Sequence, residues 1–169
     1  MKHEYIAGEI VAMAGGKHPH NQIATDTLLA LGTLLRQAGS TCDVYNSDQK
    51  VRASENGPFF YPDATVVCGE PQIDSDDCLR NPTLVVEVLS ETSAEYDRGE
   101  KFRNYRQFPT LRHYLLIDQN EWHVEQYRQI EGVLWERSGV YTEQDTAIPL
   151  DELGIELPLR EIYRRVSHE

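Results

Sequence analysis

The sequence contains few cysteines. Three occur in 169 residues, at Cys42, Cys68 and Cys78. Because their number is odd and they lie far apart, their spacing suggests neither a disulfide framework nor a CxxC zinc site. We therefore expect reduced thiols in a reducing compartment.

Long apolar runs are also missing. No segment approaches the roughly 18 consecutive apolar residues from which a membrane-spanning helix is predicted. The N-terminal stretch MKHEYIAGEI lacks the hydrophobic region and the cleavage site of a secretory signal peptide. These two absences predict a soluble, cytoplasmic protein without a membrane partner.

Positive charge is scarce. The chain has 16 Lys and Arg against 28 Asp and Glu, which gives a formal charge of −12. Such a charge opposes general attraction to a polyanion such as DNA. Five cations nevertheless fall within fifteen residues: Arg98, Lys101, Arg103, Arg106 and Arg112. They form either a local basic surface or an ordinary solvated helix face.

Length and composition indicate one domain. An apolar content of 40% in 169 residues is enough for one complete core and too little for two ordinary domains. The chain shows no internal repeat, low-complexity segment or obvious linker. We therefore predict a single domain over residues 1–169.

Periodicity predicts two helices and two groups of strands. Residues 20–35 have helical spacing, and residues 42–54 show the loose alternation of a strand. Residues 62–68 and 83–90 are Val-rich segments typical of buried, paired strands. A second helix over residues 91–108 starts with Thr92 and Glu95 at capping-box spacing, ends before Pro109 and buries Phe102, Tyr105 and Phe108.

The C-terminal third continues the pattern. Three successive strands are expected over residues 112–118, 121–128 and 133–142, followed by a short helix over residues 159–166. The order is therefore helix, three strands, helix, three strands. This order predicts an α/β fold in which helices cover both faces of a mixed sheet.

Two acidic residues lie in the Val-rich segments. Glu87 is surrounded by apolar residues, so its carboxylate must be protonated, paired or bound to a metal, unless the strand end reaches solvent. Asp63 follows Pro62, and strand parity gives Asp63 and Glu87 one face if the strands are neighbours. Converging carboxylates suit Mg²⁺ or Mn²⁺.

The motifs together resemble the PD-(D/E)XK nuclease superfamily, and more closely the Uma-type family of restriction-endonuclease-like proteins, which is abundant in cyanobacteria. The matching segments are GEI (8–10), His20, YPDATVV (61–67), VVEVLSETS (85–93), DRGEKFRNY (97–105) and HYLLID (113–118). The resemblance implies a mixed central sheet flanked by helices and an endonuclease that uses Mg²⁺ or Mn²⁺, with DNA as the expected partner. It also implies a homodimer, for which the strands after residue 111 offer an interface.

Leu89 departs from the superfamily pattern, because it stands where the motif has its lysine. In some branches that lysine lies on the neighbouring helix, and the resemblance then assigns its role to Lys101. Helical spacing places Asp97, Lys101 and Tyr105 on one face. The alternative is an exposed Asp97–Lys101 ion pair worth a few tenths of a kcal/mol.

Four further residues are candidates for support of this site. His20 is expected to face inward, either as a hydrogen-bonded structural residue or as a donor or proton shuttle. Glu9 is either an extra acidic ligand or a hairpin acid. Asp97 and Arg98 either support Lys101 and contact phosphate, or lie on the surface.

The resulting hypothesis is metal-dependent phosphodiester hydrolysis. Asp63 and Glu87 hold the cation, the cation lowers the pKa of a bound water, and Lys101 orients that water or stabilises developing charge. Two alternatives stay open. One is a nucleic-acid or protein-binding module whose catalytic centre is weakened by Leu89, and the other is a hydrolase of smaller phosphorylated substrates.

Overall fold

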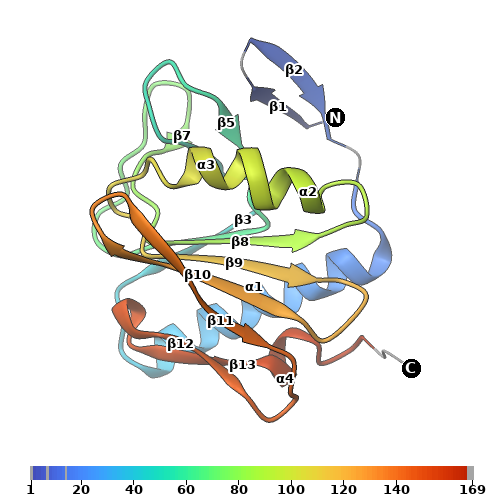
Figure 1. Cartoon of the computed structure of the whole chain (residues 1–169). Coiled ribbons are helices and arrows are strands. Elements are labelled where there is room, and N and C mark those ends of the chain that lie inside the picture. The colour runs from blue at the N-terminus through green and yellow to red at the C-terminus, as the bar shows by residue number, and fades with distance from the viewer. Residues whose placement is uncertain (1, 7, 14, 167–169) are drawn as a thin grey trace.

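A six-stranded mixed sheet forms the centre of the molecule (Figure 1). The structure, a computed structural model, describes residues 2–6, 8–13 and 15–166. The strand order is β11-β10-β9-β8-β6-β3. These strands are β3 (Asp43–Asn46), β6 (Ala64–Val67), β8 (Leu84–Leu89), β9 (His113–Asp118), β10 (Val124–Glu131) and β11 (Leu134–Tyr141). Only β8 and β9 run parallel within it, so the predicted mixed α/β sheet is confirmed.

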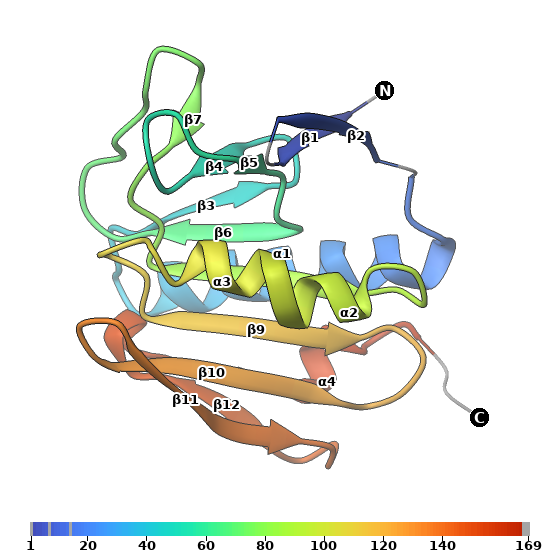
Figure 2. The same cartoon turned by 45° about the horizontal axis from the view of Figure 1, so that its top comes forward.

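Helices cover both faces of this sheet, as Figure 2 shows. On one face α1 (His18–Gln37) packs Ile23 and Leu31 against Val86 of β8. On the other face lies a continuous helical stretch of α2 (Ala94–Tyr96), the π-helical turn η1 (Asp97–Lys101) and α3 (Phe102–Tyr105). Because strand side chains alternate, neighbouring Val85 packs into this second core. None of the described helices has the length and apolar character needed to span a bilayer.

A second, five-stranded sheet packs on the side of the α2–α3 stretch, in the order β2-β1-β5-β4-β7. Its strands are β1 (His3–Ile6), β2 (Glu9–Ala12), β4 (Lys50–Arg52), β5 (Phe59–Phe60) and β7 (Cys78–Leu79). A hairpin of β12 (Ala147–Leu150) and β13 (Ile155–Pro158), joined by the 3-10 turn η2 (Asp151–Leu153), precedes α4 (Leu159–Ile162). The predicted element order was therefore incomplete, because strands of two to four residues show too little periodicity to be recognised.

The two predicted helix ends need correction. The helix expected to open with a Thr92–Glu95 capping box begins at Ala94, and its N-cap, Ser93, makes no side-chain capping bond. Instead, the Ser93 backbone N–H donates to Ser90 Oγ, which supplies the turn before the helix. The last helix is confined to α4 and does not reach Val166. The predicted sheet-facing stripe of Phe102, Tyr105 and Phe108 is confirmed, since all three are buried.

The expectation of three reduced thiols was wrong. A disulfide joins Cys42 to Cys68, although 26 positions separate them in the sequence. Antiparallel β3 and β6 pair Asp43 with Val67, so the next pair in this register brings the two cysteines together, with their Cα atoms 4.2 Å apart. Cys78 is buried and free. This pairing could not be predicted from the sequence, because the pairing depends on the register of β3 and β6.

Loss of the Cys42–Cys68 bond is expected to lower the free energy of unfolding by about 2–4 kcal/mol, because the unfolded chain regains the freedom of the closed loop. Urea unfolding with and without reductant measures the change. The double variant Cys42→Ser/Cys68→Ser, which should not respond to reductant, is the control. Alkylation under denaturing conditions should modify one thiol before reduction and three afterwards. Three modified thiols in the unreduced protein would contradict the pairing.

Candidate active site

Asp63 and Glu87 face each other across two paired strands. Antiparallel β6 and β8 pair Ala64 with Val86, and the next step of this register sets Asp63 opposite Glu87. The Val88 backbone N–H donates to Asp63 Oδ2 over 2.8 Å, which holds this carboxylate against β8. The structure thus brings together the two acids that strand parity placed on one face.

Lys101 reaches the same point from the helical stretch above the sheet. Its ammonium nitrogen lies 2.9 Å from Glu87 Oε1, 3.2 Å from Glu4 Oε1 and 3.6 Å from Asp97 Oδ1. Both Lys101 and Asp97 are buried, so the alternative of an exposed helix ion pair was wrong. Burial by itself lowers the pKa of Lys101, but the three surrounding carboxylates outweigh it and raise that pKa. Lys101 is therefore a fixed positive charge inside an acidic cluster.

Negative charge exceeds positive charge in this cluster. Burial raises the pKa of Glu87 well above its ordinary value, and the charges of Asp97 and Asp63 add to the rise, while Lys101 opposes it. The pKa of Asp97 is raised by burial in the same way. The Tyr105 hydroxyl donates to Glu87 Oε1 over 2.7 Å and supplies one further stabilising contact. One ammonium is thus shared among several carboxylates.

This surplus of carboxylate oxygens suits a divalent metal ion. Mg²⁺ and Mn²⁺ prefer hard oxygen ligands, and a buried anionic surplus is relieved by an added cation. Within the described part of the chain, however, no three His, Cys, Asp or Glu side chains are already grouped to hold an ion. The carboxylate oxygens therefore suit a metal ion, and in this structure the Lys101 ammonium lies among them.

His20 connects the first helix to the acid pair. Its Nε2 lies 3.4 Å from Asp63 Oδ2, and its Nδ1 is buried without a hydrogen-bond partner. Burial lowers the pKa of His20, but the hydrogen bond and charge of Asp63 outweigh this effect and raise it. The side chains of His20 and Asp63 are 16% and 15% exposed, against 5% for Lys101 and Glu87. Solvent therefore reaches the cluster from the His20–Asp63 side.

Two of the candidate supporting residues lie elsewhere. Glu9 is exposed on β2, and the described residues include no contact between it and the cluster. Arg98 is directed to Glu125 on β10, to which its Nε and terminal nitrogen donate over 3.0 and 2.7 Å. The N-terminal acid that does reach the cluster is Glu4 of β1, whose Oε1 also accepts the Tyr61 backbone N–H.

Sequence reasoning missed Glu4 because a four-residue strand at the N-terminus carries little periodicity. The one indication in the sequence is that Glu4 is followed by aromatic Tyr5 and apolar Ile6. The structure also places Leu89 in the apolar core beneath the α2–α3 stretch, at 2% exposure. Leu89 thus serves packing, and the ammonium beside Glu87 belongs to Lys101 of η1.

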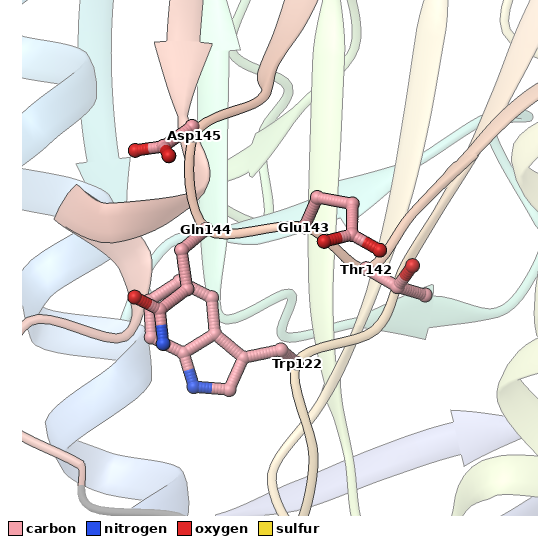
Figure 3. A pocket seen from close by; sticks show the side chains of 5 residues that line it. All are labelled: Trp122, Thr142, Glu143, Gln144 and Asp145. Carbon is pink, nitrogen blue, oxygen red and sulfur yellow. The ribbon is translucent and has the colours of Figure 1, made fainter.

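A surface hollow elsewhere shares no residue with this cluster. It is lined by Trp122, Thr142, Glu143, Gln144 and Asp145 (Figure 3). Its acidic residues are exposed, and Asp145 forms a surface ion pair with Arg160. Exposed carboxylates of this kind remain hydrated, so the hollow lacks the charge imbalance of the buried cluster.

Comparisons with known proteins place the chain among nuclease-like proteins. The model of the Uma2 family, described as "Putative restriction endonuclease", matches residues 1–160. Uncharacterized protein sll1609 of Synechocystis is 37% identical over 138 residues, covering 79% of this chain and 76% of the relative. Uncharacterized protein slr1290 of the same organism is 34% identical over 168 residues, covering 98% and 85%.

The fold has a solved counterpart. A crystal structure of a "putative nuclease" from Anabaena variabilis superimposes with a TM-score of 0.74 at 16% sequence identity, covering 96% of this chain and 89% of that one. This likeness supports the restriction-endonuclease-like fold.

Replacement of Lys101 by methionine should destabilise the fold by about 3–5 kcal/mol at neutral pH, because it leaves buried carboxylates without their cation. Glu87 and Asp97 already have raised pKa values in the folded state. At pH values between the ordinary and the raised pKa of these two carboxyl groups, the folded state binds protons that the unfolded state does not. The variant should therefore regain stability as pH falls through this range.

Urea unfolding at several pH values measures this effect. Lys17→Met is the matched control, because that exposed ammonium lies 3.9 Å from Glu91 and should contribute little. Equal losses in the two variants would refute the central role of Lys101.

Proposed function

Because the chain belongs to the Uma2 family of restriction-endonuclease-like proteins, we propose that it hydrolyses phosphodiester bonds in nucleic acid with the help of a divalent metal. DNA is the proposed substrate. The observation that carries the proposal is the buried cluster in which Asp63 faces Glu87 and the Lys101 ammonium lies 2.9 Å from Glu87. Metal-dependent phosphodiester hydrolysis is served by carboxylates that can bind a cation and by a fixed positive charge, and this cluster contains both kinds of group.

Asp63 and Glu87 would hold the cation, Mg²⁺ or Mn²⁺. When bound, such an ion supplies Lewis acidity, which activates a water molecule as nucleophile and neutralises phosphate charge. Lys101, whose raised pKa keeps it protonated, would supply the positive charge and the hydrogen-bond donor for the phosphate oxygen that gains charge. Asp97 and Glu4 position its ammonium from 3.6 and 3.2 Å.

His20 has a supporting role in the same proposal. Its contact with Asp63 orients the carboxylate, and its position on the solvent side gives it access to protons. The raised pKa of His20 favours its protonated form, which has a proton to donate. Its function would therefore be to hold Asp63 and to move a proton between the cluster and solvent.

Three substitutions test these roles: Asp63→Asn, Glu87→Gln and Lys101→Gln. Each should lower cleavage of DNA in Mg²⁺ or Mn²⁺ by at least about a hundredfold, since each removes charge at the reacting centre. Single- and double-stranded DNA and RNA serve as substrates. Glu143→Gln, on the separate hollow of Figure 3, is the matched control and should retain activity. Cleavage unchanged in all three variants would exclude this assignment.

A second candidate is a nucleic-acid or protein-binding module on the same fold. It is favoured by Lys101, which already neutralises Glu87, and by Leu89, which occupies the motif lysine's strand position. Such a module would keep its affinity for a macromolecule without needing a metal.

Calorimetry separates the two candidates. With a nuclease, Mn²⁺ should bind the wild-type protein at near-millimolar concentration, and Asp63→Asn should weaken binding about tenfold or more, because a charged oxygen ligand is lost. Glu143→Gln should bind like the wild type. Absence of metal binding together with retained DNA affinity would favour the module.

Three broader features belong to this proposal: a single nuclease-like domain over residues 1–169, a homodimer and a cytoplasmic location. Support for a dimer comes from the edge strand β11 and the exposed apolar side chains of its hairpin, namely Ile130, Val133, Leu134 and Val140. Light scattering determines the number of copies. A cytoplasmic location requires the Cys42–Cys68 bond to resist reduction by cellular thiols.

A further inference from the structure

Cations without an acidic partner are concentrated in one region of this acidic protein. Of the 16 Lys and Arg side chains, seven have no carboxylate within 4.0 Å among the described residues. These are Arg36, Lys50, Arg103, Arg106, Arg112, Arg137 and Arg164. Four of them lie on or beside the α3 helix and the hairpin of β10 and β11. The charge of these four arginines is therefore available to an external anion.

Three aromatic rings form the base of this region. The ring of Phe102 lies 4.7 Å from that of Tyr127 and 5.5 Å from that of Trp135, measured between centroids. Phe102 belongs to α3, while the other two rings belong to β10 and β11. Tyr127 and Trp135 are only partly buried, so both present ring surface to solvent.

Three exposed arginines surround these rings. The Arg106 guanidinium carbon lies 5.1 Å from the centre of the Phe102 ring. Arg137 is the strand partner of Tyr127. Arg112 donates to Gln129 Oε1, and Gln129 is the strand partner of Trp135. We call Phe102, Tyr127, Trp135 and these three arginines the arginine–aromatic surface.

This surface lies on the same face of the sheet as the acidic cluster. Phe102 directly follows Lys101 in the chain, and both are held by the helical stretch that covers this face (Figure 2). Across the sheet, Glu87 pairs with Leu116 of β9, which pairs in turn with Glu125 of β10. The Tyr127 hydroxyl donates to Glu125, so the surface begins two strands from Glu87.

We propose that the arginine–aromatic surface binds the sugar–phosphate backbone of DNA beside the active site. This inference rests on the proposed nuclease function and adds the place where the substrate is held. Guanidinium groups match phosphate geometry and bind it by two hydrogen bonds. In a chain with a charge of −12, approach of a polyanion requires a local group of unpaired cations.

Binding is measured with a fluorescently labelled DNA duplex in the presence of a chelator, so that no cleavage occurs. Arg106→Gln/Arg137→Gln is compared with Arg36→Gln/Arg164→Gln, which removes the same charge from exposed, unpaired arginines elsewhere. Each phosphate contact releases counterions from the DNA, so loss of one contact should weaken binding about eightfold near 0.1 M salt. The first double variant should therefore bind about sixtyfold more weakly, with a salt slope reduced by about 1.8. The second should bind like the wild type.

Tryptophan fluorescence gives a second, local measurement. The chain has two tryptophans, so Trp122→Phe leaves Trp135 as the reporter, and Trp135→Phe leaves Trp122. DNA should quench the first variant and leave the second unchanged. Equal melting temperatures of all variants establish that the fold is kept.

The outcomes separate this inference from the nuclease proposal. The proposal that this surface binds DNA would be overturned if DNA binding were weakened equally in the two arginine double variants, or if the wild type did not bind DNA. Cleavage that depends on Glu87 would still support the nuclease. Conversely, DNA binding that depends on Arg106 and Arg137, without cleavage in any metal, would support the surface and reject the nuclease.

Discussion

The buried ammonium of Lys101 is the interaction on which the centre of this fold depends. It lies among carboxylates from three separate elements, Glu87 of β8, Glu4 of β1 and Asp97 of the π-helical turn. Removal of these charges from water is costly, and only their mutual contacts offset that cost. The cluster therefore links the N-terminal hairpin, the central sheet and the covering helix through one charge.

The same cluster links stability to chemistry. One ammonium cannot neutralise Glu87, Glu4 and Asp97 together. Burial raises the pKa values of Glu87 and Asp97, and the charges of neighbouring acids add to the rise. Charge of this kind sits in water-poor surroundings, where electrostatic effects on a phosphate are strong. A proposed DNA-binding surface on the same sheet face allows the substrate to be held apart from these repelling acids.

Much of this arrangement could be predicted from local patterns. Val-rich segments identified β6 and β8, and strand parity placed Asp63 and Glu87 on one face. Helical spacing placed Lys101 on the same helix face as Tyr105, and both are buried. What depends on distant contacts could not be predicted. Glu4 reaches the cluster through a second sheet of very short strands, and the Cys42–Cys68 bond depends on strand register. The π-helical turn likewise depends on tertiary packing, because no sequence pattern predicts it.

The parallel pairing of β8 with β9 has a consequence for where a nuclease lysine can reside. Parallel neighbours cannot be joined by a tight hairpin, so the chain must cross over the sheet between them, and here it does so as the α2–α3 stretch. In this fold the crossover is helical and passes above Glu87. An amine can reach that carboxylate either from the strand itself or from this bridge, so Leu89 is free to fill the core without depriving Glu87 of its cation.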